Sequence, residues 1–171
     1  PHITKRYSMP WSAPAARMRE FVLALRAIWA CWYEEKPLEF LGKFYTHTRM
    51  TPFFTPTHTE YGAPKIYLAA VGPRMTEVAG EVADGLLVHG FTTEAYLRET
   101  TLPALERGFA KAGRSRGDFE IVYPVFSVTG RDEKELKASD TKMRQQVAFY
   151  GSTPAYKPVL DSIGAGELQP E

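Results

Sequence analysis

The sequence contains a single cysteine and no excess of either charge. With only Cys31 among its 171 residues, the chain can form neither an internal disulfide nor a cysteine-based zinc site. Its 21 basic and 20 acidic side chains nearly balance, and neither sign runs in blocks. Nucleic acid and anionic membrane surfaces are therefore not expected partners. Because the chain has a single cysteine, a reducing cytoplasm is the predicted compartment.

Long apolar runs and several catalytic motifs are also missing. No apolar stretch is long enough to span a bilayer, so no membrane partner is expected. The absence of G-x-G-x-x-G, Walker, nucleophile-elbow and H-E-x-x-H motifs leaves a nicotinamide Rossmann site, a P-loop, a serine hydrolase and a zinc protease without support. His47 and His58 each lie within Thr-His-Thr, but no carboxylate accompanies them at ligand spacing, and no metal site is predicted.

Helices and apolar strands alternate along most of the chain. Residues 12–32 carry apolar side chains at helical spacing, with Ser12 as the expected cap and Pro14 in the first turn. The apolar runs 64–70 and 86–90 show little alternation, which is typical of strands buried on both faces of a parallel sheet. The other expected elements are helices over 74–83, 92–113 and 132–151 and a strand over 119–130.

This alternation predicts an α/β fold with right-handed crossover units on a parallel sheet. An open doubly wound sheet and part of an eightfold barrel both satisfy it. A complete barrel takes about 250 residues, so this chain cannot supply all eight strand-helix units. Two prolines are expected to interrupt the predicted elements. Pro103 should kink or divide the helix over 92–113, and Pro124 removes one hydrogen-bond donor from the strand over 119–130.

Three segments between residues 6 and 91 follow one another in a distinctive order. A helix ends in Leu-Arg-Ala-Ile-Trp, a hairpin-like run contains Phe-Leu-Gly-Lys-Phe-Tyr, and a strand with a Gly-Pro turn precedes Ala-Gly-Glu-Val-Ala-Asp-Gly. Together they resemble the luciferase-like flavin and deazaflavin oxidoreductases. The resemblance implies a partial (β/α)8 TIM barrel of the bacterial-luciferase-like type, holding strands five to seven with their helices.

The resemblance also implies a domain organisation. Residues 1–171 would form a single partial barrel domain, the C-terminal part of such a barrel, truncated at both ends. Residues 34–63 would be an aromatic hairpin or loop excursion from it. The start at Pro1 and the glycine-rich tail 162–171, which looks unstructured, agree with that expectation.

The function implied by the resemblance is cofactor chemistry on a small organic substrate. A reduced deazaflavin, coenzyme F420, would transfer hydride, or a flavin such as FMN would support monooxygenation, while the barrel binds, orients and excludes water. The deazaflavin branch is preferred because of the Gly-Pro turn and the Ala-Gly-x-x-Ala-Asp-Gly run. An FMN-dependent monooxygenase is one alternative, and an inactive half-barrel or scaffold is another. Many family members are dimers, so a homodimer is possible.

The turn after strand 64–70 is the predicted cofactor site. Ligands of parallel α/β folds bind beyond the carboxyl ends of strands, where helix starts present free N–H groups. Ala70, Val71, Gly72, Pro73 and Arg74 form this turn; glycine permits backbone approach to a phosphate, and arginine adds a charge. The alternative is that Gly72 and Pro73 only make a tight turn between strand and helix.

Two histidines and a glycine complete the predicted site. His89 ends the strand 86–90, where it can donate a hydrogen bond to the cofactor or act as a catalytic acid or base, and Gly90 follows it. The alternative for His89 is a bond to a loop carbonyl. By the resemblance, His2 lies in a loop that contacts the cofactor ring or its tail, and Phe91 replaces a lysine that reaches the phosphate in some deazaflavin-dependent relatives.

Overall fold

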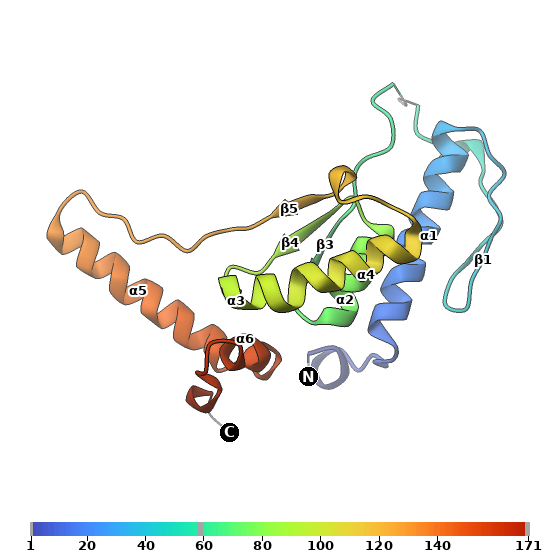
Figure 1. Ribbon diagram of the computed structural model, residues 1–171. Helices are drawn as coiled ribbons and strands as arrows, with labels where there is room; N and C mark the ends of the chain where they lie inside the picture. Colours follow the sequence, from blue (N-terminus) through green and yellow to red (C-terminus); the bar gives the residue numbers. More distant parts are fainter. Residues whose placement is uncertain (1, 58–59, 170–171) are drawn as a thin grey trace.

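The computed structural model describes residues 2–57 and 60–169, and its centre is a three-stranded parallel sheet. The strands are β3 (Tyr67–Ala70), β4 (Gly85–Val88) and β5 (Glu120–Val122), in the order β3-β4-β5 (Figure 1). All neighbouring pairs are parallel. The predicted α/β fold with crossover connections is confirmed, because a helix follows β3 and helical turns follow β4 before the chain returns to the sheet.

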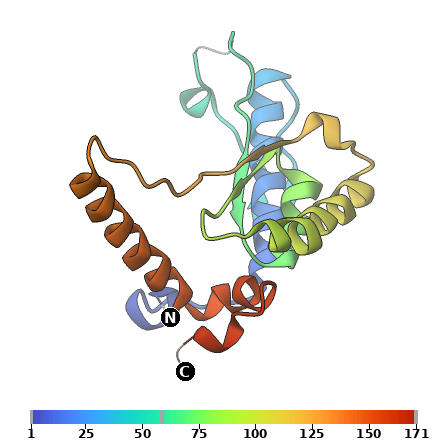
Figure 2. The same cartoon turned by 60° about the vertical axis from the view of Figure 1, so that its left-hand side comes forward.

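Three helices cover one face of this sheet. They are α1 (Pro14–Tyr33), α2 (Pro73–Val82) and α4 (Leu102–Ala112), and Figures 1 and 2 place them together on the same side. The core between them and the strands is built mainly from apolar side chains, as expected from burial of the apolar helix stripes. Its buried members are Val22, Leu68, Val78, Ala79, Val82, Ala83, Leu86, Val88, Leu105, Phe109 and Phe119.

The helices α2 and α4 cross at a point where neither has a side chain. A Cβ atom on Gly80 would lie 2.6 Å from the carbonyl oxygen of Leu105, and one on Gly108 would lie 2.1 Å from that of Glu77. Both distances are shorter than any real van der Waals contact, so only glycine permits this approach. The glycine of the Ala-Gly-x-x-Ala-Asp-Gly run therefore serves helix packing.

A two-stranded hairpin lies along α1. Its strands β1 (Phe40–Leu41) and β2 (Thr46–His47) are antiparallel. The Glu20 carboxylate of α1 accepts hydrogen bonds from three successive amides of the hairpin turn, at 3.0 Å from Lys43, 2.5 Å from Phe44 and 2.7 Å from Tyr45. A Cβ on Gly42 would lie 2.1 Å from that carboxylate, which explains the glycine of the Phe-Leu-Gly-Lys-Phe-Tyr run.

The remaining elements are short except for one long helix. This helix, α5, has no buried residue. It begins away from the sheet, at the end of a stretch without regular structure, and runs back toward α6 (Figures 1 and 2). The elements are η1 (His2–Arg6), η2 (Pro52–Phe54), α3 (Glu94–Tyr96), η3 (Leu97–Thr101), η4 (Arg116–Asp118), α5 (Glu133–Gly151), η5 (Pro154–Tyr156), α6 (Lys157–Asp161) and η6 (Gly166–Leu168). None of the helices in 2–57 and 60–169 is long and apolar enough to cross a membrane.

Several local predictions need correction. The cap of α1 is Ala13 in a left-handed conformation (φ 43°), because the helix starts at Pro14 and Ser12 lies one position too early. The third strand ends at Val122 instead of residue 130, since Pro124 has no amide hydrogen to continue the ladder. The tail predicted as unstructured contains η6 within its described part.

The predicted interruption at Pro103 takes the form of a π-helical turn. The helix predicted over 92–113 consists of α3, the π turn η3 and α4, and the Leu102 amide donates to the carbonyl of Leu97, five residues earlier. A proline early in a helix removes one donor at the step where the hydrogen-bond register changes. Gly113 ends α4 in a left-handed conformation, as predicted for a closing glycine.

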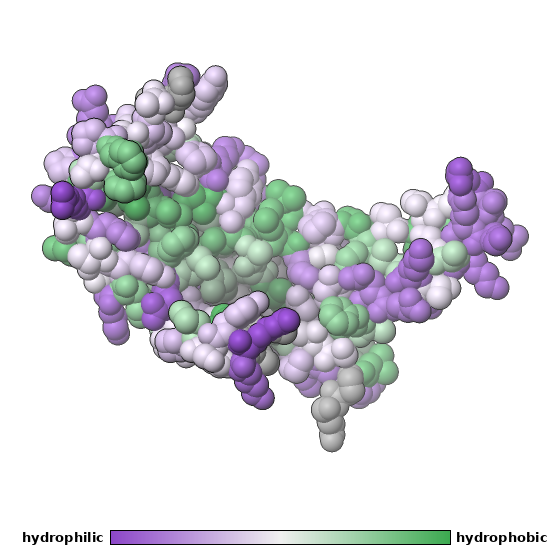
Figure 3. All heavy atoms as spheres, turned by 180° about the vertical axis from the view of Figure 1, so that it is seen from behind, coloured by the Kyte–Doolittle hydropathy of each residue, from purple (hydrophilic) through white to green (hydrophobic). Residues whose placement is uncertain are grey.

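The second face of the sheet is open and apolar. Ala69, Leu87 and Val122 form one row across the three strands, and all three are exposed. Leu87 is 41% exposed, whereas its neighbour Leu86 points to the covered face and is 0% exposed. Figure 3 looks onto this face, where hydrophobic side chains gather in the centre. The prediction of strands buried on both faces is therefore wrong for the described residues, because all three covering helices lie on one side.

Candidate functional site

A cavity of about 510 Å³ opens at the carboxyl end of the sheet. The ends of β3 and β4 form its floor, the segment after β5 forms one side, and the end of α5 with η5 forms the other. The lining residues are Ala69, Ala70, Val71, Leu87, Val88, His89, Gly90, Pro124, Phe126, Tyr150 and Tyr156. The sheet edge at which parallel α/β folds bind ligands thus carries a cavity with mostly apolar and aromatic walls.

His89 is the titratable group at the centre of this lining. Its ring stacks on Tyr156 with centroids 4.7 Å apart and meets the edge of Tyr150 at 4.6 Å. The Phe91 amide donates a hydrogen bond to His89 Nδ1 at 3.1 Å. Partial burial lowers the pKa of His89, so the imidazole is neutral at pH 7. The alternative of a bond from the ring to a loop carbonyl is not found among the described residues, where the ring's hydrogen bond is the one that Nδ1 accepts from the Phe91 amide.

The turn after β3 leads directly into α2. Gly72 caps the helix in an extended conformation, and its carbonyl oxygen accepts hydrogen bonds from both the amide and the hydroxyl of Thr76, each at 3.1 Å. Since Pro73 has no amide hydrogen, the first free N–H groups of the helix are those of Arg74 and Met75. A Cβ on Gly72 would meet nothing within 4 Å, so the space in front of the turn is open.

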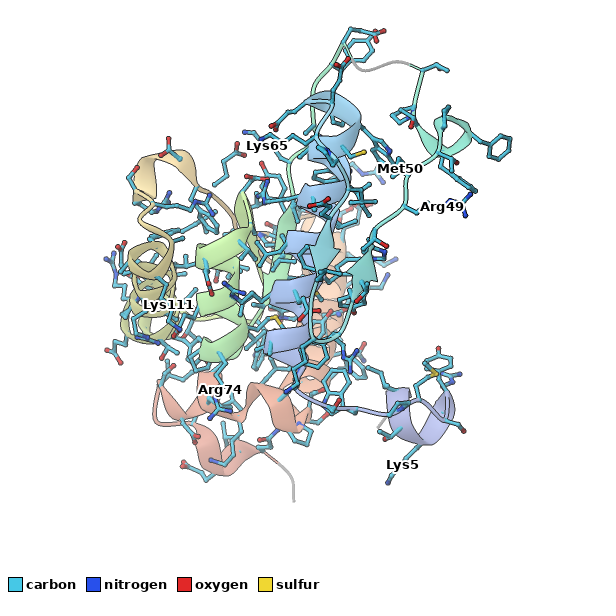
Figure 4. The ribbon with its side chains drawn as sticks, turned by 90° about the vertical axis from the view of Figure 1, so that its right-hand side faces the viewer. Lys5, Arg49, Met50, Lys65, Arg74 and Lys111 are labelled. Atoms are coloured by element: carbon cyan, nitrogen blue, oxygen red, sulfur yellow. The ribbon has the colours of Figure 1, made fainter. Side chains whose placement is uncertain are left out.

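A second cavity, of about 620 Å³, lies in front of this turn. Its lining comes from the first turns of α1 and α2: Ala13, Pro14, Ala15, Ala16, Gly72, Pro73, Arg74 and Met75. Arg74 forms no hydrogen bond or ion pair with any described residue, and Figure 4 shows its side chain projecting at the amino end of α2, opposite to Lys65. An open helix start with a free cation has the chemistry of a phosphate or carboxylate site.

The predicted site residues therefore divide between two neighbouring cavities. Ala70, Val71, His89 and Gly90 line the first, and the range 72–74 lines the second. Consecutive residues of one turn connect them. Of His2, only the backbone in η1 belongs to the described structure, so its predicted contact with a cofactor lies outside the side chains that can be compared.

The structure adds aromatic residues that the sequence did not single out. Phe126, Tyr150 and Tyr156 line the first cavity, and the Tyr96 hydroxyl donates to the Val71 carbonyl at 3.1 Å, which fixes the turn. Burial raises the pKa of Tyr96, so this hydroxyl keeps its proton. Phe91, the position of the missing lysine, is buried against Tyr150 and Tyr156. The one available signal was the density of aromatic residues around the end of helix 132–151.

Two further features carry no site chemistry. A cavity of about 560 Å³ beside the N-terminal segment is apolar, and Arg17, its cation, already contacts the Phe44 ring and the Ser12 hydroxyl. Among the described residues, no group of three histidine, cysteine, aspartate or glutamate side chains can hold a metal ion. His47 stacks on Tyr45, while His58 lies outside the described residues.

The fold and the cavities together define a class. A parallel sheet whose carboxyl edge carries a cavity, with a free helix start beside it, is the arrangement of ligand-binding α/β proteins that place their sites on the loops after the strands. More specifically, the chain belongs to the luciferase-like monooxygenase family, whose sequence profile matches residues 1–168. The resemblance seen in the sequence is thereby confirmed.

Relatives within the family include enzymes that use coenzyme F420. An uncharacterized protein of Mycobacterium tuberculosis is 55% identical over 171 residues, which are 100% of this chain and 50% of that protein. The 5,10-methylenetetrahydromethanopterin reductase of Archaeoglobus fulgidus is 31% identical over 95% of this chain and 45% of its own length. The F420-dependent glucose-6-phosphate dehydrogenase of Nakamurella multipartita is 28% identical over 78% of this chain and 37% of its own.

A solved structure has the same fold over most of the chain. The coenzyme F420 dependent tetrahydromethanopterin reductase from Methanopyrus kandleri aligns with a TM-score of 0.66 and 23% identity, covering 91% of this chain and 42% of its own. The chain thus spans about half the length of the proteins that it matches. At this identity, the structural likeness concerns the fold alone.

Proposed function

We propose that the protein is an oxidoreductase that binds reduced coenzyme F420 and transfers hydride to or from a small organic substrate. The observation that carries the proposal is the pair of adjoining cavities at the carboxyl edge of the sheet. An F420-dependent relative at 28% identity supports the choice of cofactor. We further propose that β3, β4 and β5 are strands five to seven of a barrel, within one domain over 1–171 and with 34–63 as an excursion from it.

The residues fit a cofactor with a phosphate and a planar ring. The free amides of Arg74 and Met75, the free guanidinium of Arg74 and the open space at Gly72 suit the phosphate. The aromatic walls around His89 suit the ring. When bound, the deazaflavin supplies the hydride; the protein's own residues bind the phosphate, orient the ring and exclude water. His89 contributes the polar contact to the ring side.

The test of this proposal is coenzyme binding, followed by absorbance or fluorescence of reduced and oxidised F420 in the natural full-length protein. Gly72→Val should abolish binding without loss of stability, because its side chain enters open space that only the ligand would occupy. Arg74→Ala should weaken binding by about 1–3 kcal/mol, with the lower end expected for a screened contact. Arg98→Ala, in an exposed pair with Glu94, is the matched control and should bind as the parent does.

Two outcomes would overturn parts of the proposal. If both site variants fold and bind F420 as tightly as the parent, the turn is structural and holds no phosphate. If the protein binds FMN alone, it is an FMN-dependent monooxygenase, which is the alternative within the same family. A protein that binds neither cofactor would favour the inactive half-barrel or scaffold.

The proposal also covers the cellular compartment and the oligomeric state. The single cysteine supports a reducing, cytoplasmic compartment. The open apolar face of the sheet requires a cover in solution, which the rest of a barrel would supply; a homodimer formed through another surface is compatible with this. Mass measurement in solution tests the dimer directly.

A further inference from the structure

The hydrogen bond between Phe91 and His89 determines which ring nitrogen of the histidine carries the proton. A backbone amide can only donate, so His89 Nδ1, 3.1 Å from the Phe91 nitrogen, must present a bare lone pair. A neutral imidazole with an unprotonated Nδ1 carries its hydrogen on Nε2. The geometry of the strand end therefore selects one of the two tautomers.

A half-turn rotation of the ring would break the hydrogen bond from the Phe91 amide, and two aromatic rings pack against the ring in its present orientation. Tyr156 stacks on one face of the His89 ring at an interplanar angle of 28°, and Tyr150 contacts it edge to face at 83°. The Thr92 amide also donates to the carbonyl oxygen of His89 at 2.9 Å, which holds the backbone of the turn. Tyr150 of α5 and Tyr156 of η5 thus contact the His89 ring, and the Thr92 amide holds the His89 backbone.

The other ring nitrogen, Nε2, is accessible to a ligand. No described residue accepts a hydrogen bond from it, and no side-chain nitrogen or oxygen among the described residues is both buried and without a partner. Nε2 is therefore accessible, and His89 lines the 510 Å³ cavity. The groups that face the ring from the packed elements are the phenols of Tyr150 and Tyr156. Among the described residues, no carboxylate lines the cavity and could draw a proton onto the ring.

We infer that His89 acts on the cavity only as a hydrogen-bond donor through Nε2–H, so the cavity recognises a ligand group that accepts a hydrogen bond. A proton taken up by the neutral ring would have to bind at Nδ1, where the Phe91 amide already lies, so a base role is excluded. The fitting ligand groups are a carbonyl oxygen or an unprotonated ring nitrogen of a planar molecule packed against the aromatic walls. The pyrimidinedione ring of a deazaflavin or flavin offers carbonyl oxygens in both redox states and an unprotonated ring nitrogen when oxidised, and this identification alone rests on the proposed function.

The first experiment tests the tautomer without any cofactor. In the natural full-length protein labelled with ¹⁵N-histidine, NMR should show His89 with a protonated Nε2 and an unprotonated Nδ1 at pH 7. His47, which stacks on Tyr45 and accepts no amide hydrogen bond on its ring in the described part of the chain, serves as the internal reference for the histidine signals. A His89 ring protonated at Nδ1, or charged at pH 7, overturns the inference.

The second experiment tests the contact with coenzyme F420 as the probe. Binding should shift the His89 Nε2 resonance and leave its tautomer unchanged. His89→Gln, whose amide nitrogen reaches about as far as Nε2, should retain affinity within about threefold, whereas His89→Leu should lose about tenfold or more. A bound coenzyme with an unchanged Nε2 resonance, or equal affinity of His89→Leu and parent, overturns the assigned contact. If neither F420 nor FMN binds, the proposed function fails, and the tautomer measurement alone decides the inference.

Discussion

Arg26 and Asp84, which are 58 positions apart in the sequence, form an ion pair with 2.9 Å between Nη2 and Oδ1. The same guanidinium donates to the carbonyl oxygen of Val82 through Nε and Nη2, at 3.0 and 2.8 Å. The other carboxylate oxygen of Asp84 accepts from the Ile66 amide at 2.7 Å. One contact thus joins α1, the end of α2 and the start of β3, and it connects the Leu-Arg-x-Ile-Trp segment to the Ala-Asp-Gly segment.

Removal of the arginine should destabilise the fold. Arg26→Ala leaves the Val82 carbonyl and one oxygen of Asp84 without their partner, and we expect the free energy of unfolding to fall by about 1–3 kcal/mol. The midpoint of urea denaturation measures it. Arg107→Ala, at an exposed ion pair with Glu77, is the control and should cost at most about 1 kcal/mol. If both variants lose the same free energy of unfolding, the contact between Arg26 and Asp84 contributes no more than an exposed ion pair.

The glycine pair between α2 and α4 should not tolerate alanine. Gly108→Ala places a methyl group 2.1 Å from the carbonyl oxygen of Glu77, so the helices must separate, and we expect a loss of about 2 kcal/mol or more. Gly117→Ala is the control, because its methyl group would meet only the Ser115 hydroxyl at 3.6 Å. Thermal unfolding of the two variants compares them. A Gly108→Ala protein as stable as the control would show that the helices do not approach this closely.

The neighbours Leu86 and Leu87 should respond differently to truncation. Leu86→Ala opens a hole in the core and should cost about 2–5 kcal/mol. Leu87→Ala removes a side chain that is 41% exposed and should cost clearly less, while reducing the binding of a hydrophobic dye to the open face. Chemical denaturation and dye fluorescence test the pair. A cost at Leu87 as large as that at Leu86 would mean that this face is covered in solution.

The attachment of the hairpin to α1 should depend on pH through Glu20. Desolvation alone would raise the pKa of this carboxyl, but the amides of Phe44, Tyr45 and Lys43 and the charge of Arg17 outweigh it and lower the pKa. The stabilisation is therefore complete above the ordinary titration range of glutamate and disappears as the pH falls through the lowered pKa.

Hydrogen exchange of the hairpin-turn amides measures this dependence. Protection at Phe44 and Tyr45 should decrease on acidification in the parent, and Glu20→Gln should show reduced protection already at pH 7. Glu39→Gln, at an exposed position of the same hairpin segment, should leave the protection unchanged. Protection that is independent of both pH and Glu20 would contradict the proposed attachment.

The order of strands and helices could be predicted from the sequence because it depends on local patterns. The apolar runs that contain Leu68 and Leu86, the Asp84-Gly85 stop and the closing Gly113 each act within a few residues. The end of β5 could not be predicted well. The apolar run continues beyond Val122, but the missing amide hydrogen of Pro124 ends the strand earlier. The cap of α1 failed for a similar reason, since a shift of one residue exchanges Ser12 for Ala13.

Only the part of the site that directly follows the strands could be predicted from the sequence. The turn 70–74 and His89 follow strands directly, so their place at the carboxyl edge follows from topology. Tyr150 and Tyr156 reach the same cavity from a segment more than 60 positions further along the chain, and no local pattern indicates where a solvent-exposed helix returns to the sheet. The tautomer of His89 likewise depends on the angle of a turn, which sequence patterns do not encode.

The weak attachment of α5 has a consequence for how the cavity opens. The helix buries no residue of its own, and residues 123–132 that lead to it have no regular structure, yet it carries Tyr150 at its end. Local opening of this arm can therefore dismantle the His89 cavity while the sheet and its covering helices stay folded. A ligand that binds only the assembled cavity would favour the closed arrangement, so occupancy should reduce proteolytic cleavage within 123–132 although the ligand would not touch most of that segment.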